Sequence, residues 1–312
     1  LLSSACIQPG TPKGLAGPTP ASPVEPVAPT PASPVEPIKP VQQVAVKELT
    51  ILNSSAEAAF PAQLNFSLQA ASSVNISDIR LHYTINREAF ARVTSEVYID
   101  FVTGTTISVQ WPWDMRQTGG LPIGAGVNYW WTVKDISGAK TETAPASINF
   151  DDNRYVWKSL TDAKLTIYWY SGDLSFAREL MSAAQQAVTR LAQNTGANLK
   201  KPAKIYIYAN TQDLQGAMIF PQEWTGGVAF TDYGIITIGI NQSNLDWGKG
   251  ALAHELTHQI VHQMTFNPYI DLPTWLEEGL AVYNEGELDA GFVASLKMAL
   301  DNNSLISVRS LA

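Results

Sequence analysis

The residues best suited to chemistry in this sequence form the run His-Glu-Leu-Thr-His at residues 254–258. The chain has 4 histidines in all, and His254, His258 and His262 fall close together. On an α-helix, residues four apart lie on one face, so the imidazoles of His254 and His258 can bind a single metal ion. Glu255 lies about 100° around the helix axis, where its carboxylate can take a proton from a water molecule at the metal. This layout predicts a hydrolytic Zn²⁺ site.

Two helices are predicted to carry this region. The first begins near Asn244, continues with apolar residues at helical spacing as far as Met264, and ends before Asn267-Pro268, because proline disfavours helical geometry in the preceding residue. The second begins near Pro273, a residue favoured at the first helical position, and reads Pro-Thr-Trp-Leu-Glu-Glu-Gly-Leu-Ala-Val-Tyr to Tyr283.

With its Trp-Leu-Glu-Glu-Gly-Leu-Ala run at residues 275–281, the second helix resembles that of the gluzincin zinc metallopeptidases, and among them the peptidase MA-like family. The resemblance implies a zincin-like fold, peptide substrates and Glu278 as the third zinc ligand. Such domains usually extend well past that ligand, whereas this sequence stops at Ala312, so the resemblance allows for a C-terminal truncation. The later helices of the family often supply a tyrosine or histidine that stabilises the oxyanion. Tyr283 and Tyr269 are the available substitutes, and Tyr283 is the candidate retained here.

Helix geometry also favours Glu278 over its neighbour Glu277. Consecutive helical residues point about 100° apart, so only one of the two carboxylates can face the metal. Glu278 shares a face with the apolar residues Trp275 and Ala281, whereas Glu277 shares its face with residues 273 and 274 and is expected to be solvated. Because Leu280 also lies near Glu277, that residue stays open as an alternative ligand.

His262 is predicted to be a packing residue, although it lies on the same helical face as the other two histidines. On a straight helix it stands about 12 Å along the axis from His254, which is too far for both rings to reach one ion. The residues between them include no glycine at which the helix could bend. The alternative interpretation of the whole cluster is a surface helix that happens to carry histidines.

Composition narrows the classes of protein. The chain has 312 residues, a net charge of −8 and 15% charged residues, which suits two modest domains plus a tail. The acidic balance and the lack of basic clusters argue against nucleic-acid binding. No apolar run is long enough to span a membrane, so membrane contact would require an anchor.

The N-terminal residues predict such an anchor. Residues 1–8 contain Leu-Leu-Ser-Ser-Ala-Cys and resemble the end of a bacterial lipoprotein signal peptide, in which the cysteine is lipidated. The sequence does not start with methionine, so an upstream segment is expected to have been removed. Cys6 is the only cysteine, which excludes an intramolecular disulfide. The alternative is a thiol without function in a disordered leader.

Residues 9–44 are predicted to be a disordered linker. They are rich in proline, and Thr-Pro-Ala-Ser-Pro-Val-Glu-Pro occurs at residues 19–26 and again at 30–37. Proline removes backbone donors and favours extended polyproline II segments, so this stretch should act as a semi-rigid spacer. Recognition by a proline-binding partner is the less favoured interpretation.

Residues 45–150 are predicted to form an immunoglobulin-like or fibronectin-like β-sandwich. Apolar and polar residues alternate in segments at 48–52, 63–68, 79–85, 106–111 and 127–133, with a turn after Asp135. Tryptophans at 111, 113, 130 and 131 are interpreted as core residues, with a ligand-stacking face as the alternative.

Residues 151–312 show the mixed pattern of an α+β domain. Strands are predicted at 165–170 and 205–208, a helix at 174–193, a hairpin at 226–239 and a last helix at 291–301. This order fits the first half of a zincin domain. Val228–Phe230 is the candidate edge strand along which an extended substrate would pair, and an ordinary interior strand is the alternative.

Together these features predict an extracytoplasmic zinc peptidase, anchored to the membrane through lipidated Cys6. His254, His258 and Glu278 would hold Zn²⁺, and Glu255 would act as general base on a metal-activated water. One alternative is a cell-surface binding protein that uses the sandwich and carries an inactive peptidase-like domain. A passive structural protein is the other. The sequence does not identify the peptide that is cleaved.

Overall fold

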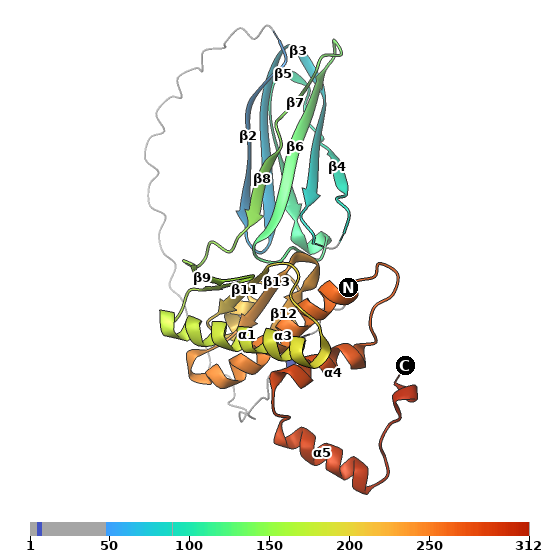
Figure 1. The fold of residues 1–312 in the computed structure, drawn as a ribbon. Coiled ribbons are helices and arrows are strands. Elements are labelled where there is room, and N and C mark those ends of the chain that lie inside the picture. Colours follow the sequence, from blue (N-terminus) through green and yellow to red (C-terminus); the bar gives the residue numbers. More distant parts are fainter. Residues whose placement is uncertain (1–4, 8–47, 89, 312) are drawn as a thin grey trace, which may run out of the picture.

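The computed structural model describes residues 5–7, 48–88 and 90–311. A β-rich unit stands on a second unit, in which helices cover another sheet (Figure 1). This arrangement confirms the predicted α+β class. The linker predicted at residues 9–44 lies outside the described residues, as does the leader apart from Ala5–Ile7, which forms strand β1.

Seven strands of the described chain form the β-rich unit. They are β2 (Thr50–Ala59), β3 (Gln63–Ile85), β4 (Thr94–Tyr98), β5 (Gly104–Asp114), β6 (Ala125–Asp135), β7 (Lys140–Glu142) and β8 (Ala146–Phe150). The segments predicted as separate strands at 63–68 and 79–85 are the two halves of β3, with a register shift between Ala71 and Ile76. The first half pairs with β2 and β5, and the second half pairs with β4 and β6. One long strand therefore runs through both layers of the sandwich.

Aromatic contacts between the layers show where the sandwich core lies. Phe66, in the first half of β3, meets Tyr129 of β6 edge-on with ring centroids 5.0 Å apart. Trp113 and Trp131 are buried, which confirms their interpretation as core residues. Trp111 is half-buried and packs against this core. For Trp130 that interpretation is wrong, because it alternates with inward-facing neighbours on β6 and stacks on His82 at 5.2 Å.

The second sheet has the strand order β1-β12-β13-β11-β10-β9. Its later strands are β9 (Lys158–Asp162), β10 (Leu165–Trp169), β11 (Ala203–Tyr208), β12 (Thr225–Phe230) and β13 (Ile235–Gly239). The helices of this unit are α1 (Leu174–Thr195), α2 (Thr211–Gln215), α3 (Leu245–Thr265), α4 (Thr274–Glu285) and α5 (Ala290–Asp301). The central strands β10, β11 and β13 are parallel, and β12 returns antiparallel to β13 as a hairpin. The predicted strands, hairpin and helices are confirmed.

The two faces of this sheet have different partners. Ile205 and Ile207 of β11 point to the face that α1 and α3 cover, and they share a core with Leu256 of α3. Tyr206 and Tyr208 alternate to the other face, where they cluster with Ile123 from the sandwich. The backbone of Gly124 lies so close to Tyr206 that a Cβ at this position would be 2.2 Å from the Tyr206 hydroxyl. Gly124 also has a φ of +74°, a conformation that favours glycine. The end of the sandwich therefore covers the face of the sheet opposite α1 and α3, together with α2, whose Leu214 joins the same cluster.

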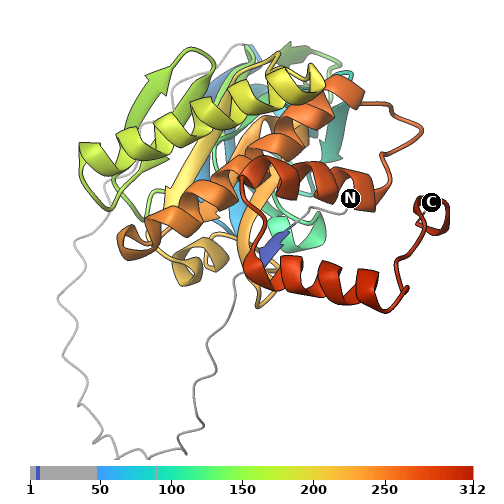
Figure 2. The same cartoon turned by 60° about the horizontal axis from the view of Figure 1, so that its bottom comes forward.

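The prediction that Val228–Phe230 is an edge strand is wrong for the described chain. Ala5 pairs with Val228 and Ile7 pairs with Thr225, so β1 adds an outer antiparallel strand beside β12 (Figure 2). Residues 5–7 lie more than 200 positions from β12 in the sequence. The alternation of apolar and polar residues predicts a strand and its two faces, but it carries no information about such a distant partner strand.

The helices after β13 differ in how much of their own surface is buried. α3 packs against α1, α4 and β12, whereas α5 lies apart from the body and is exposed along nearly all its length (Figure 1). Among the described residues, no helix combines the length and the apolar character that crossing a membrane requires.

Candidate metal centre

Helix α3 places its apolar core residues and its histidines on separate stripes along its surface. Leu252, Leu256 and Ile260, spaced four apart, are fully buried in the core shared with the sheet and α1. His254 and His258 follow the same spacing but start two residues later, which turns their stripe about 200° around the axis. There they are covered by α4 and remain buried, at 5% and 2% exposure. The predicted helix thus delivers both imidazoles to one side, as its sequence required.

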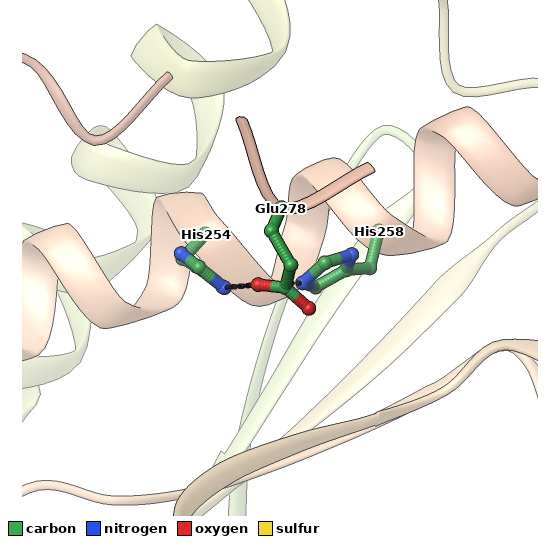
Figure 3. Close-up of side chains that lie close together, drawn as sticks. All are labelled: His254, His258 and Glu278. Atoms are coloured by element: carbon green, nitrogen blue, oxygen red, sulfur yellow. Dashed lines mark ion pairs between the residues drawn. The ribbon is translucent and has the colours of Figure 1, made fainter. Parts of the chain in front are cut away.

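Glu278 of α4 reaches between these two rings (Figure 3). Its Oε2 lies 3.3 Å from Nε2 of His254 and 3.8 Å from Nε2 of His258. All three candidate ligand atoms lie within 4.8 Å of one another. Two ligands bound at about 2.1 Å to one tetrahedral ion are about 3.4 Å apart. The spacing therefore fits one metal ion, and two imidazoles with one carboxylate are a ligand set that suits zinc.

Two further glutamates of α4 contact the outer nitrogens of the histidines. Nδ1 of His254 lies 2.7 Å from Oε1 of Glu285, so this ring donates its Nδ1 proton there and keeps Nε2 for the metal. Nδ1 of His258 lies 3.5 Å from Oε1 of Glu277. Glu277 was expected to be solvated and instead lies beside the ring, on the side away from Glu278. The sequence prediction did not include Glu285, although it stands seven residues after Glu278 and so on nearly the same helical face.

A buried amide holds α4 in this position. Asn284 is 1% exposed, and its Nδ2 donates to Oγ1 of Thr257 on α3 at 2.8 Å and to the carbonyl of Ala187 on α1 at 3.3 Å. The backbone carbonyl of Asn284 accepts a hydrogen bond from the Arg190 guanidinium of α1 at 3.0 Å. These bonds hold α4 against α3 and α1, and they therefore set the position along α3 at which Glu278 reaches the histidines. Nothing in the local sequence marks Asn284, because its partners come from distant segments.

The general-base candidate Glu255 follows His254 directly in α3. It is 0% exposed and projects from α3 toward β12, where it approaches Gly227. A carboxylate is costly to bury unless cations or donors surround it, so complete burial beside a ligand cluster is consistent with a charged centre.

The structure does not bring His262 or Tyr283 into the cluster. His262 pairs with Asp232, with Nε2 and Oδ1 3.5 Å apart, and burial lowers its pKa while Asp232 opposes that shift. The hydroxyl of Tyr283 accepts a hydrogen bond from Asn194 of α1 at 3.3 Å, and the side chain is 58% exposed. Tyr283 stands five positions after Glu278, which turns it about 140° away around α4. Tyr269, the other candidate, is 90% exposed.

A comparison with protein families finds a match in the C-terminal part of the chain. Residues 183–312 match the model of the Peptidase MA superfamily. This range includes both helices of the candidate centre and leaves out the sandwich. No match was found among curated proteins.

Three solved structures with local similarity are distant from this chain. One is a catalytically inactive form of OgpA from Akkermansia muciniphila with an O-glycopeptide substrate, at 9% identity and a TM-score of 0.25, covering 34% of this chain and 29% of that one. Another is the third fibronectin III domain of human KIAA0343, at 10% identity and a TM-score of 0.25, covering 37% and 91%. A β-1,3-glucan binding domain of carbohydrate-binding module family 56 matches at 20% identity and a TM-score of 0.20, covering 32% and 98%. At these TM-scores the similarities carry no argument about this chain.

Proposed function

Since residues 183–312 are a peptidase MA superfamily domain with a His254–His258–Glu278 cluster, we propose that this metallopeptidase uses zinc, with Glu255 as its general base. The observation that carries the proposal is the convergence of Glu278 on both imidazoles. Its Oε2 lies 3.3 and 3.8 Å from their Nε2 atoms, although Glu278 comes from a separate helix.

The chemistry expected is hydrolysis of a peptide bond. Zn²⁺ at this cluster supplies a Lewis acid, which lowers the pKa of a water molecule and polarises the substrate carbonyl. Glu255 accepts the proton of the attacking water and passes it to the leaving amine. Its complete burial against β12 keeps bulk water away from that carboxylate. Glu285 holds His254 in the tautomer that leaves Nε2 for the ion.

A substitution of the base tests this assignment. Glu255→Gln keeps the shape of the side chain but cannot take a proton, so turnover of fluorescein-labelled casein should fall by about 100-fold or more. Zinc, measured by elemental analysis, should stay near one ion per chain, because the three ligands are untouched. Glu287→Gln, which changes an exposed glutamate beyond the end of α4, serves as the control and should match the wild type.

The same measurements discriminate between the alternatives. A wild-type protein that binds no zinc would refute the enzyme assignment. A wild-type protein that binds zinc but cleaves neither casein nor a mixed peptide library would favour the surface binding protein with an inactive peptidase-like domain.

We also propose that the protein acts outside the cytoplasm, anchored by a lipid on Cys6. The support is the position of the single cysteine directly before a proline-rich stretch suited to be a spacer. In cells that produce the precursor with its signal peptide, wild-type protein should partition into the detergent phase of Triton X-114. Cys6→Ser should move it to the aqueous phase, and wild-type protein in the aqueous phase would contradict the anchor.

A further inference from the structure

Gly227 lies in β12 directly above the candidate general base. It pairs with Ile238 of β13, and Ala229, two residues further along the same face of the strand, is buried in the core that the sheet shares with α3. Because side chains two apart in a strand point to the same side, position 227 also faces α3. The strand thus presents a position without a side chain to the helix that carries Glu255.

The space at this position is filled by Glu255. A Cβ on Gly227 would lie 2.9 Å from Oε1, 3.2 Å from Cγ and 3.3 Å from Cδ of Glu255. All three nearest atoms belong to that one side chain. Rotating the terminal carboxylate alone would not relieve the contact, since Cγ is also too close, so an added methyl group would move the whole side chain about its Cα–Cβ bond.

Backbone conformation does not explain the glycine. Gly227 is not among the residues with positive φ, so an L-amino acid can adopt its backbone geometry. What the position requires is room for the carboxylate. Glu255 is 0% exposed and belongs to a turn of α3 in which its neighbours are buried as well, so it cannot swing out into solvent.

We propose that Gly227 is a positioning residue for the peptidase reaction: by having no side chain, it lets the Glu255 carboxylate occupy the place from which it acts. This inference rests on the proposed function of Glu255. A side chain at 227 displaces the base by several tenths of an ångström and leaves the ligands His254, His258 and Glu278 where they are. Misplacing a catalytic group by about 1 Å can cost about 100-fold in rate, so this smaller shift should cost about 10-fold.

The first test is Gly227→Ala. We expect kcat for an internally quenched peptide selected from a library on the wild type to fall about 10-fold. KM should stay within about twofold, and zinc should remain at one ion per chain. The matched control is Gly104→Ala in the sandwich, where the added Cβ meets only the Thr106 carbonyl at an ordinary 3.5 Å and should leave kcat unchanged. An unchanged kcat in Gly227→Ala would overturn the proposal.

A double-substitution cycle separates positioning from general damage to β12. Glu255→Ala removes Cγ, Cδ and the carboxylate oxygens, which are the atoms that the new methyl group would meet. The Gly227→Ala change should therefore cost about 10-fold in the Glu255 background and less than about twofold on the residual rate in the Glu255→Ala background. A loss of equal size in both backgrounds would show that the methyl group harms the strand rather than the base.

A crystal structure of zinc-free Gly227→Ala provides a readout that needs no activity. The Glu255 carboxylate should be displaced from β12 relative to the wild type, while the Glu278 carboxylate keeps its place between the two imidazoles. An undisplaced Glu255 would refute the inference even if the protein is a peptidase. A wild type that hydrolyses nothing would instead refute the proposed function, whatever the position of Glu255.

Discussion

Replacing Glu285 by alanine should weaken zinc binding, although Glu285 does not itself face the ion. Its Oε1 lies 2.7 Å from Nδ1 of His254, so it orients the ring and makes Nε2 a better donor to a cation. Removing such an outer carboxylate typically costs 10–100-fold in metal affinity. The Glu285 side chain is 36% exposed, which lets water screen its charge and partly replace it.

The expected loss is therefore at the lower end of that range. Glu285→Ala should raise the zinc dissociation constant about 10-fold, equivalent to about 1.4 kcal/mol. Glu285→Gln keeps an oxygen that can accept the Nδ1 proton but loses the charge, which roughly halves the strength of the hydrogen bond, so about threefold is expected.

The assay is competition for zinc against a chromophoric chelator at fixed pH. Glu287→Gln, an exposed glutamate two residues further along, should bind zinc as tightly as the wild type. His254→Ala should lose most of the affinity. If Glu285→Ala binds zinc within twofold of the wild type while His254→Ala does not, the hydrogen bond at 2.7 Å does not support the metal site and the reasoning fails.

Two further predictions concern the helices around the centre. Asn284→Ala should lower the free energy of unfolding by about 1–3 kcal/mol in urea titrations, because it removes the buried bonds to α3 and α1, and a change below about 0.5 kcal/mol would contradict the bracing role. His262→Gln should reduce the loss of stability on acidification, measured as Tm of the zinc-free protein between pH 7 and 5. Burial lowers the folded-state pKa of His262 below its ordinary 6.5, so the unfolded chain binds its proton first, and stability falls as pH drops through 6.5 toward the folded value. An equal pH dependence of Tm in the variant and the wild type would show that His262 contributes nothing to it.

Local spacing along one helix was sufficient to predict that His254 and His258 lie together. The i, i+4 pair His254 and His258 must share a face on any α-helix, and helix α3 formed within a few residues of its predicted start and end. The choice of Glu278 over Glu277 also followed from helix geometry together with the family resemblance. The class α+β and the order of strands and helices after residue 155 followed from hydrophobic periodicity.

Other features depend on contacts between segments that are far apart in the chain. The sequence could not show that Asn284 would bond to Thr257 and Ala187, nor that Ala5–Ile7 would pair with β12. Glu277 illustrates the same limit, since its helical face suggested solvent while the approach of α4 to α3 set it beside His258. A single helix specifies the direction of its own side chains. The packing of helices and strands against one another decides what each side chain meets, because that depends on distances between segments that no local pattern contains.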